Sequence, residues 1–161
     1  MVPLCLIDIK DVKEFTAEIY AVRFIRLINI LKTVIKLYVD GGTRGMAICL
    51  YDQQRHKYII KRRKGATTNN DLEYLAIIYG IEYARKFYPR DSIIIYSDSK
   101  LAVNQINGIY RVNGDNLIAL HKKTMRKLTP RVDIVWVRRN FNFAGIHLES
   151  LRAYLRSSQG K

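Results

Sequence analysis

The segment that most constrains the fold is a short β-branched run, Ser92 to Ser97, which lies between two segments with helical features. Its three consecutive isoleucines favour a strand that is buried on both faces. Strands of that kind occur in parallel sheets, where the connections pass through helices that cover the faces of the sheet. The run therefore predicts an α/β domain.

Three further strand-like runs precede it, and short glycine-containing or polar turns between them favour an antiparallel meander. These runs are Val34 to Asp40, Met46 to Tyr51, and Lys57 to about Arg63. A helix is predicted from Asn70 to about Tyr88, with Asn70 as its N-cap and Glu73 in the capping pattern. Because crossovers between parallel strands are right-handed, this helix can return the fourth strand to the side of the first.

The remaining sequence predicts more helices and one more strand. The helices are expected at about Lys100 to Ile106, Asn116 to Leu128, and from Phe143 or Ala144 to Arg156, and the strand at Val132 to Val137. The chain thus combines strands and helices in one α/β body.

The charge balance restricts the partners. The chain has 161 residues, enough for one domain with a substantial core, and carries 28 Lys and Arg against 14 Asp and Glu. A net charge of +14 and a pI near 9.9 favour nucleic acid or an anionic membrane surface as partner. No apolar run reaches the roughly 18 residues of a membrane span, so no membrane partner is expected.

Two cysteines, Cys5 and Cys49, form neither a disulfide framework nor a metal-binding spacing. This usage fits a reducing compartment and predicts a cytoplasmic location, while pairing of the two thiols stays open.

Residues 1–33 form an apolar and basic N-terminal extension, distinct from the body at residues 34–161. Val12, Phe15, Ile19 and Val22 fall on one face of a predicted helix. Docking on the body, a homodimer formed through the extension, and an added basic contact to nucleic acid are all open roles.

Three carboxylates lie at the ends of predicted elements. Asp40 follows the first strand, Glu73 opens the first helix of the body, and Asp98 follows the fourth strand. Each alone fits an ordinary turn or cap. Together they lie where the strand order of an open α/β sheet reverses, which is where such sheets bind ligands. Carboxylates brought that close repel one another, and a divalent cation such as Mg²⁺ relieves the repulsion.

The phrases around these acids resemble those of type 1 ribonuclease H, in the style of its archaeal members, over roughly Val34 to Leu155. The matching phrases are Tyr38-Val39-Asp40-Gly41, Thr67-Thr68-Asn69-Asn70-Asp71-Leu72-Glu73, and Ser97-Asp98-Ser99-Lys100-Leu101. The resemblance implies a ribonuclease H-like fold, with a five-stranded mixed sheet in the order 3-2-1-4-5 flanked by helices.

The resemblance also implies an activity. It predicts an endonuclease that cuts the RNA strand of RNA–DNA hybrids and leaves 5′-phosphate ends, using two Mg²⁺ or Mn²⁺ ions. Asp40 would contact both ions, and Glu73 and Asp98 would complete their separate shells. Double-stranded RNA is a second candidate substrate.

Five further residues are expected, by the same resemblance, to bind substrate. Asn69, Asn70 and Gln105 would contact 2′-hydroxyls and base edges, the groups that distinguish RNA from DNA. Ser99 would assist there, and Thr68 would hold a phosphate of the DNA strand. Basic residues that crowd the third strand and its exit would add a positive field: Lys57, Lys61, Arg62, Arg63 and Lys64.

Two departures from the family pattern leave alternatives open. The loop after Asp40 is short, and Gly145 stands where a fourth acid is expected at the start of the last helix. Glu149, one helical turn further, is a candidate replacement ligand. A catalytically weak hybrid-binding module is therefore one alternative. A DNA-cutting integrase or resolvase of the same fold is another, although Glu73 argues against it because those enzymes carry the third acid on the last helix.

Overall fold

The structure is a computed structural model that describes residues 34–42, 47–62 and 68–158. The predictions for residues 1–33, including the helix, the homodimer and the pairing of Cys5, lie outside the described residues. None of the helices within these ranges is long and apolar enough to cross a membrane.

Five strands form one mixed sheet in the order β3-β2-β1-β4-β5, which confirms the predicted order. Strands β1 and β2, and β2 and β3, pair antiparallel, whereas β4 runs parallel to both β1 and β5. The strands are β1 (Ile35–Gly42), β2 (Ala47–Asp52), β3 (Lys57–Arg62), β4 (Ile93–Ser97) and β5 (Val132–Trp136).

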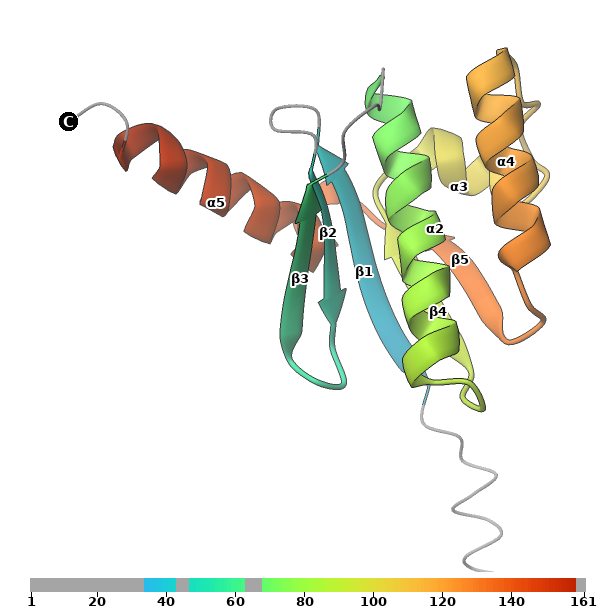
Figure 1. Cartoon of the computed structure of the whole chain (residues 1–161), viewed down its shortest axis with the longest axis horizontal. Helices are drawn as coiled ribbons and strands as arrows, with labels where there is room; N and C mark the ends of the chain where they lie inside the picture. Colours follow the sequence, from blue (N-terminus) through green and yellow to red (C-terminus); the bar gives the residue numbers. More distant parts are fainter. Residues whose placement is uncertain (1–33, 43–46, 63–67, 159–161) are drawn as a thin grey trace, which may run out of the picture. The chain divides into compact units, whose positions relative to one another are not determined.

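Helices cover the two faces of the sheet unequally (Figure 1). The long helix α2 packs over β1 with α4 beside it, and α5 contacts β1 and β2 from the opposite face. The core lies between α2 and the sheet, where Leu37, Ile77 and Ile95 are fully buried. The helical elements are α2 (Asn69–Phe87), α3 (Lys100–Ile106), α4 (Asp115–Lys127), the 3-10 turn η1 (Arg139–Phe141) and α5 (Phe143–Ser158).

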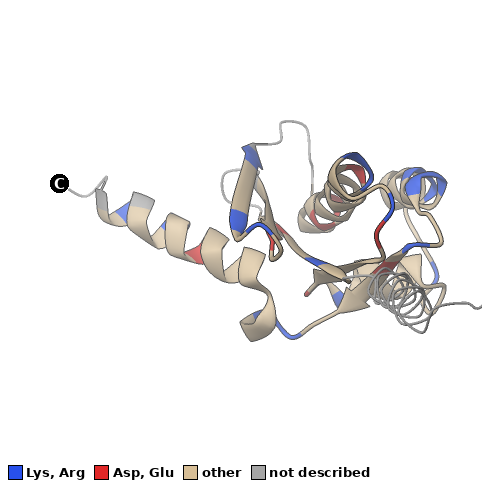
Figure 2. Ribbon diagram, turned by 90° about the horizontal axis from the view of Figure 1, so that it is seen from below, with Lys and Arg blue, Asp and Glu red and all other residues tan. Residues whose placement is uncertain are grey.

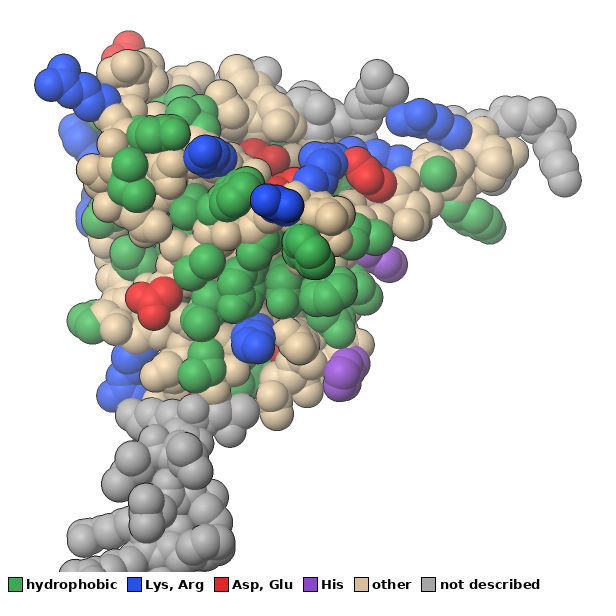
Figure 3. Space-filling view, turned by 180° about the vertical axis from the view of Figure 1, so that it is seen from behind, with side chains coloured by type: hydrophobic (Ala, Val, Ile, Leu, Met, Phe, Trp, Pro, Cys, Tyr) green, Lys and Arg blue, Asp and Glu red, His purple; other side chains and the backbone are tan. Residues whose placement is uncertain are grey.

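The face that carries α5 remains partly open. Hydrophobic side chains gather in the middle of this face (Figure 3), and the rings of Tyr38 and Tyr96 stack there at 4.8 Å. The prediction that β4 is buried on both faces is therefore wrong, because its residues alternate between buried and half-buried. The reason is that α5 lies against β1 and β2 and leaves β4 without a helix on that side.

Helix α2 begins one residue earlier than predicted, and its cap is different. Thr68 is the N-cap, its hydroxyl accepts the Asp71 backbone N–H at 3.2 Å, and the Asp71 carboxylate accepts the Thr68 N–H at 3.0 Å. The predicted cap at Asn70, with Glu73 as its partner, is therefore wrong. Thr68 and Asp71 have the same three-residue spacing as Asn70 and Glu73, and this earlier pair forms the capping box. As a result, Glu73 is not used in capping and faces the sheet.

Candidate active site

The three predicted carboxylates converge at the carboxyl ends of the central strands β1 and β4. Asp40 is on β1, Asp98 follows β4, and Glu73 lies in the second turn of α2. Each offers an oxygen, and these atoms all lie within 4.8 Å of one another. The parallel pairing of Val39 with Ser97 explains the approach, because it brings the carboxyl ends of β1 and β4 to the same edge.

Gly41 allows α2 to come close enough to complete the group. A Cβ atom at this position would lie 2.4 Å from the backbone carbonyl of Leu72, which is closer than real contacts permit. The absence of a side chain lets the end of β1 meet the first turns of α2 directly. The Gly41 N–H then donates to the Glu73 carboxylate at 3.3 Å and orients it toward Asp40.

Burial and mutual repulsion weaken the acidity of two of these groups. Asp40 is 2% exposed and Glu73 is 6% exposed. Loss of hydration raises the pKa of Asp40 to about 6, with a further contribution from the charge of Asp98. Loss of hydration, followed by the charges of Asp40 and Asp98, raises the pKa of Glu73 to about 9.

This group fits a divalent cation. Two ionised carboxylates 4.8 Å apart repel each other by about 3 kcal/mol at an effective dielectric constant of about 20. A bound cation converts that repulsion into attraction, and carboxylate oxygens are ligands that Mg²⁺ and Mn²⁺ prefer. Within the described ranges, no other set of three His, Cys, Asp or Glu side chains comes together in this way.

Asn142 is a site residue that the sequence reasoning missed. It is fully buried, and its amide N–H₂ donates to the Asp98 carboxylate at 2.7 Å and to the Val39 carbonyl at 3.0 Å. It therefore joins the end of β1 to the side chain that follows β4. The available signal was its position directly before the last helix, where Asn is a favoured cap. Nothing in the local sequence indicated that its amide bonds reach the sheet.

Among the described residues, Arg139 is the cation that forms an ion pair with one of the three carboxylates, and it also pairs with Glu149. Its guanidinium donates to the Asp98 carboxylate at 3.4 Å and, through Nε, to the Glu149 carboxylate at 3.0 Å. Glu149 is half-exposed and outside the group of three acids. The structure therefore does not place this candidate ligand among the three carboxylates.

Gly145 does face the carboxylates. A Cβ atom built there would lie 3.6 Å from the carboxyl carbon of Asp40 and 3.5 Å from the amide nitrogen of Asn142. A side chain at this position would thus begin next to the acidic group. Since glycine supplies none, the described residues hold three carboxylates here and not four.

Four of the five predicted substrate-binding residues lie at the starts of helices. Asn69 and Asn70 are exposed in the first turn of α2, and Ser99 is the N-cap of α3. Thr68 and Asn70 also line a cavity of about 400 Å³ between the starts of α2 and α4. Asn113 lines the same cavity and was not singled out from the sequence.

Gln105 does not join them. It is buried, its amide oxygen accepts the Tyr74 hydroxyl at 2.9 Å, and its amide nitrogen donates to the Arg111 carbonyl at 2.9 Å. Both halves of the amide are engaged inside the protein, so the structure gives Gln105 a role in holding the segment after α3.

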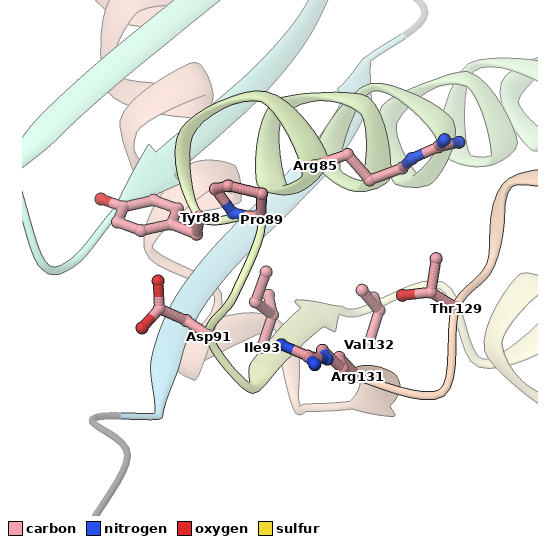
Figure 4. Close-up of a pocket in the computed structure, with 8 residues that line it drawn as sticks. All are labelled: Arg85, Tyr88, Pro89, Asp91, Ile93, Thr129, Arg131 and Val132. Carbon is pink, nitrogen blue, oxygen red and sulfur yellow. The ribbon is translucent and has the colours of Figure 1, made fainter. Parts of the chain in front are cut away.

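A separate pocket lies at the amino ends of the parallel strands β4 and β5 (Figure 4). It has a volume of about 280 Å³ and forms around Ile93 and Val132, the first residues of β4 and β5. Since the carboxylates lie at the opposite ends of the central strands, this pocket is remote from them. Lys and Arg, blue in Figure 2, are spread over the helices and strands, so the positive field extends over much of the domain.

Solved structures similar to this chain are RNase H1 proteins. RNase H1 from Halobacterium salinarum is 25% identical with a TM-score of 0.60, and the match covers 72% of this chain and 94% of that one. LC11-RNase H1, isolated from compost by a metagenomic approach, is 26% identical with a TM-score of 0.61, covering 71% and 91%. A structure of LC11-RNase H1 in complex with an RNA/DNA hybrid matches with a TM-score of 0.60 and 26% identity, covering 71% and 92%.

Among curated proteins, the bifunctional protein Rv2228c of Mycobacterium tuberculosis is 29% identical over an alignment of 122 residues, and the match covers 70% of this chain. The match spans 33% of that relative's length. The model of the RNase H family matches residues 32–138, well over half of the sequence. Together with the sheet order and the three converging acids, this match shows that the chain belongs to the RNase H family.

Proposed function

We propose that this protein is a metal-dependent endonuclease that hydrolyses the RNA strand of RNA–DNA hybrids. The observation that carries the proposal is the convergence of Asp40, Glu73 and Asp98 within 4.8 Å. The RNase H family match and the likeness to an RNase H1 solved with an RNA/DNA hybrid support the choice of substrate.

The cofactor in this proposal is a pair of Mg²⁺ or Mn²⁺ ions. Asp40, Glu73 and Asp98 would hold these ions, with Asp40 as the ligand shared by the two ions and Glu73 and Asp98 as ligands of one ion each. When bound, such ions supply an activated water and stabilise the leaving oxygen. The chain orients the ligands: the Gly41 N–H holds Glu73, and Asn142 holds Asp98.

Substrate recognition in this proposal uses the exposed start of α2. Asn69 and Asn70 contact 2′-hydroxyls and base edges, Ser99 assists, and Thr68 holds a phosphate of the DNA strand. The products carry 5′-phosphate ends. Double-stranded RNA is a further candidate substrate, and the cytoplasm is the proposed location.

The decisive experiment compares Asp40→Asn with Asp133→Asn, an exposed residue on β5 that serves as a matched control. Both are incubated with labelled hybrid, duplex DNA and duplex RNA, with and without Mn²⁺. Asp40→Asn is expected to abolish cleavage and to leave hybrid affinity nearly intact, because affinity depends mainly on phosphate contacts. The control is expected to cut only the RNA strand of the hybrid at the wild-type rate.

Two other results would select another function. Comparable cleavage of duplex DNA would move the protein to the integrase or resolvase class. Hybrid binding without cleavage at any metal concentration would favour the binding module, which Gly145 motivates because it leaves the site one acid short.

A further inference from the structure

A cationic cleft lies between β3 and the second half of α2, apart from the three carboxylates. Its volume is about 390 Å³, and four basic side chains line it: Arg55, Lys57, Lys61 and Lys86. Lys57 and Lys61 lie four residues apart on β3, so they share one face of the strand. Helix α2 packs over β1 and β2, and β3 extends beyond the helix (Figure 1). The face of β3 that carries Lys57 and Lys61 forms one wall of the cleft.

The positive charge of the cleft is largely uncompensated. Of the described residues that line it, Glu82 is the one carboxylate, and that group pairs with Lys127 at 2.9 Å. Lys57, Lys61 and Lys86 form no ion pair within the described part of the chain, whereas Arg55 pairs with the Asp52 carboxylate at 3.9 Å. An anion that enters the cleft would therefore meet three lysines that have no carboxylate to release.

Aromatic rings hold some of these cations at the wall. The Lys61 ammonium lies 4.1 Å from the centre of the Tyr79 ring, and the Arg55 guanidinium lies 4.7 Å from that of Phe87. A positively charged groove with aromatic side chains is typical of proteins that bind single nucleic-acid strands.

A buried carboxylate behind the cleft holds two of its lining residues, Arg55 and Tyr83. Asp52 is fully buried, and its carboxylate accepts the Tyr83 hydroxyl at 2.9 Å, the Tyr88 hydroxyl at 2.6 Å and the Arg55 backbone N–H at 3.1 Å. These bonds join the β2–β3 turn to the end of α2, and they keep Arg55 and Tyr83 in place at the cleft.

One end of the cleft is level with Asp40 along the strands. Asp40 pairs with Cys49 across the sheet, and Cys49 pairs with Ile60, the neighbour of Lys61. Because successive side chains of a strand alternate between faces, Lys61 lies on the opposite face of the sheet from the Asp40 side chain. Two strand spacings, about 10 Å, separate the two backbones, so a nucleic-acid strand would reach the cleft around the end of the sheet. From Lys61 to Lys57 the basic wall continues for about 13 Å along the strand, away from the active-site edge.

We propose that this cleft binds the phosphodiester backbone of an unpaired nucleic-acid strand that flanks the hybrid held at the carboxylates. The inference rests on the proposed function, because it takes the hybrid as the substrate. The volume of the cleft, about 390 Å³, fits a nucleotide-sized group. Duplex backbone lying across the same cations is the competing source of phosphate.

The test measures binding without cleavage, in EDTA, by fluorescence anisotropy. Lys57→Gln/Lys61→Gln is compared with Lys36→Gln/Arg90→Gln, which removes two exposed charges elsewhere on the domain. The ligands are a blunt hybrid and the same hybrid with an unpaired DNA tail at either end. The tail is expected to tighten wild-type binding, and the cleft variant is expected to lose that gain. Its salt dependence on the tailed ligand should fall by about 1.4 in log–log slope, or about 0.7 for each of two contacts.

The other outcomes each reject the proposal. If the cleft variant loses the same affinity for the blunt hybrid as for the tailed hybrid, the cleft binds duplex backbone. If the two variants bind each ligand equally well, only the net charge of the protein matters. This binding assay does not measure cleavage, so it can reject the proposed role of the cleft without rejecting the proposed function. The proposed function would be rejected by a separate result, namely that wild-type protein with Mn²⁺ does not hydrolyse the blunt hybrid.

Discussion

Glu73→Gln should change how the stability of the metal-free protein depends on pH. The folded protein holds the pKa of Glu73 at about 9, against 4.5 for the ordinary group. Between these values the unfolded chain releases a proton that the folded protein retains, so stability falls as pH rises. Glutamine cannot ionise in either the folded or the unfolded state, so the Glu73→Gln variant does not lose this stability as the pH rises.

The magnitude follows from the ordinary pKa and the pH. From pH 4.5 to pH 7 the stability that wild-type protein loses through Glu73 is about 3 kcal/mol, at about 1.4 kcal/mol per pH unit. The result does not depend on the folded value, provided that this value stays well above 7. The free energy of unfolding of Glu73→Gln, minus that of wild-type protein, should therefore rise by about 3 kcal/mol over this range.

Urea unfolding at several pH values, after treatment with chelator, provides the measurement. Glu82→Gln is the matched control, since Glu82 is on the same helix and exposed. The control should differ from wild type by nearly the same amount at each pH. Parallel curves for wild type and Glu73→Gln would refute the reasoning, because they would mean that Glu73 is already ionised in the folded protein. Mn²⁺ should restore wild-type stability most strongly at high pH, where the metal displaces fewer protons.

Three further predictions concern the last helix and the residue that precedes it. Asn142→Ala should lower the free energy of unfolding by about 2 kcal/mol and slow hydrolysis, as measured by urea denaturation and initial rates, because a buried and a partly buried hydrogen bond are lost. Gly145→Asp should reduce the Mn²⁺ concentration needed for half-maximal cleavage, since it adds a carboxylate beside Asp40; an unchanged metal requirement would contradict this. Glu149→Ala should keep the wild-type metal titration because Glu149 binds Arg139, and weaker metal binding would return it to the ligand set.

Much of the fold was predictable because its signals are local. Strand and helix patterns, turns and caps depend on residues within a few positions of one another. The run of isoleucines in β4 and the phrases around Asp40, Glu73 and Asp98 therefore indicated the elements and the converging acids. The cap of α2 was misplaced because two pairs with the same spacing, one at Thr68 and one at Asn70, compete within a few residues.

Contacts between distant segments were decided only by the tertiary structure. Asn142 reaches the Val39 carbonyl across 103 positions of sequence, and no local pattern specifies that bond. Gln105 lies in a phrase that resembles a substrate-binding motif, yet packing against Tyr74 places its amide inside the protein. The open side of β4 likewise depends on where α5 packs. The sequence alone thus determined the elements and the chemistry that they carry, whereas long-range packing determined which side chains face the site, because burial depends on the whole chain.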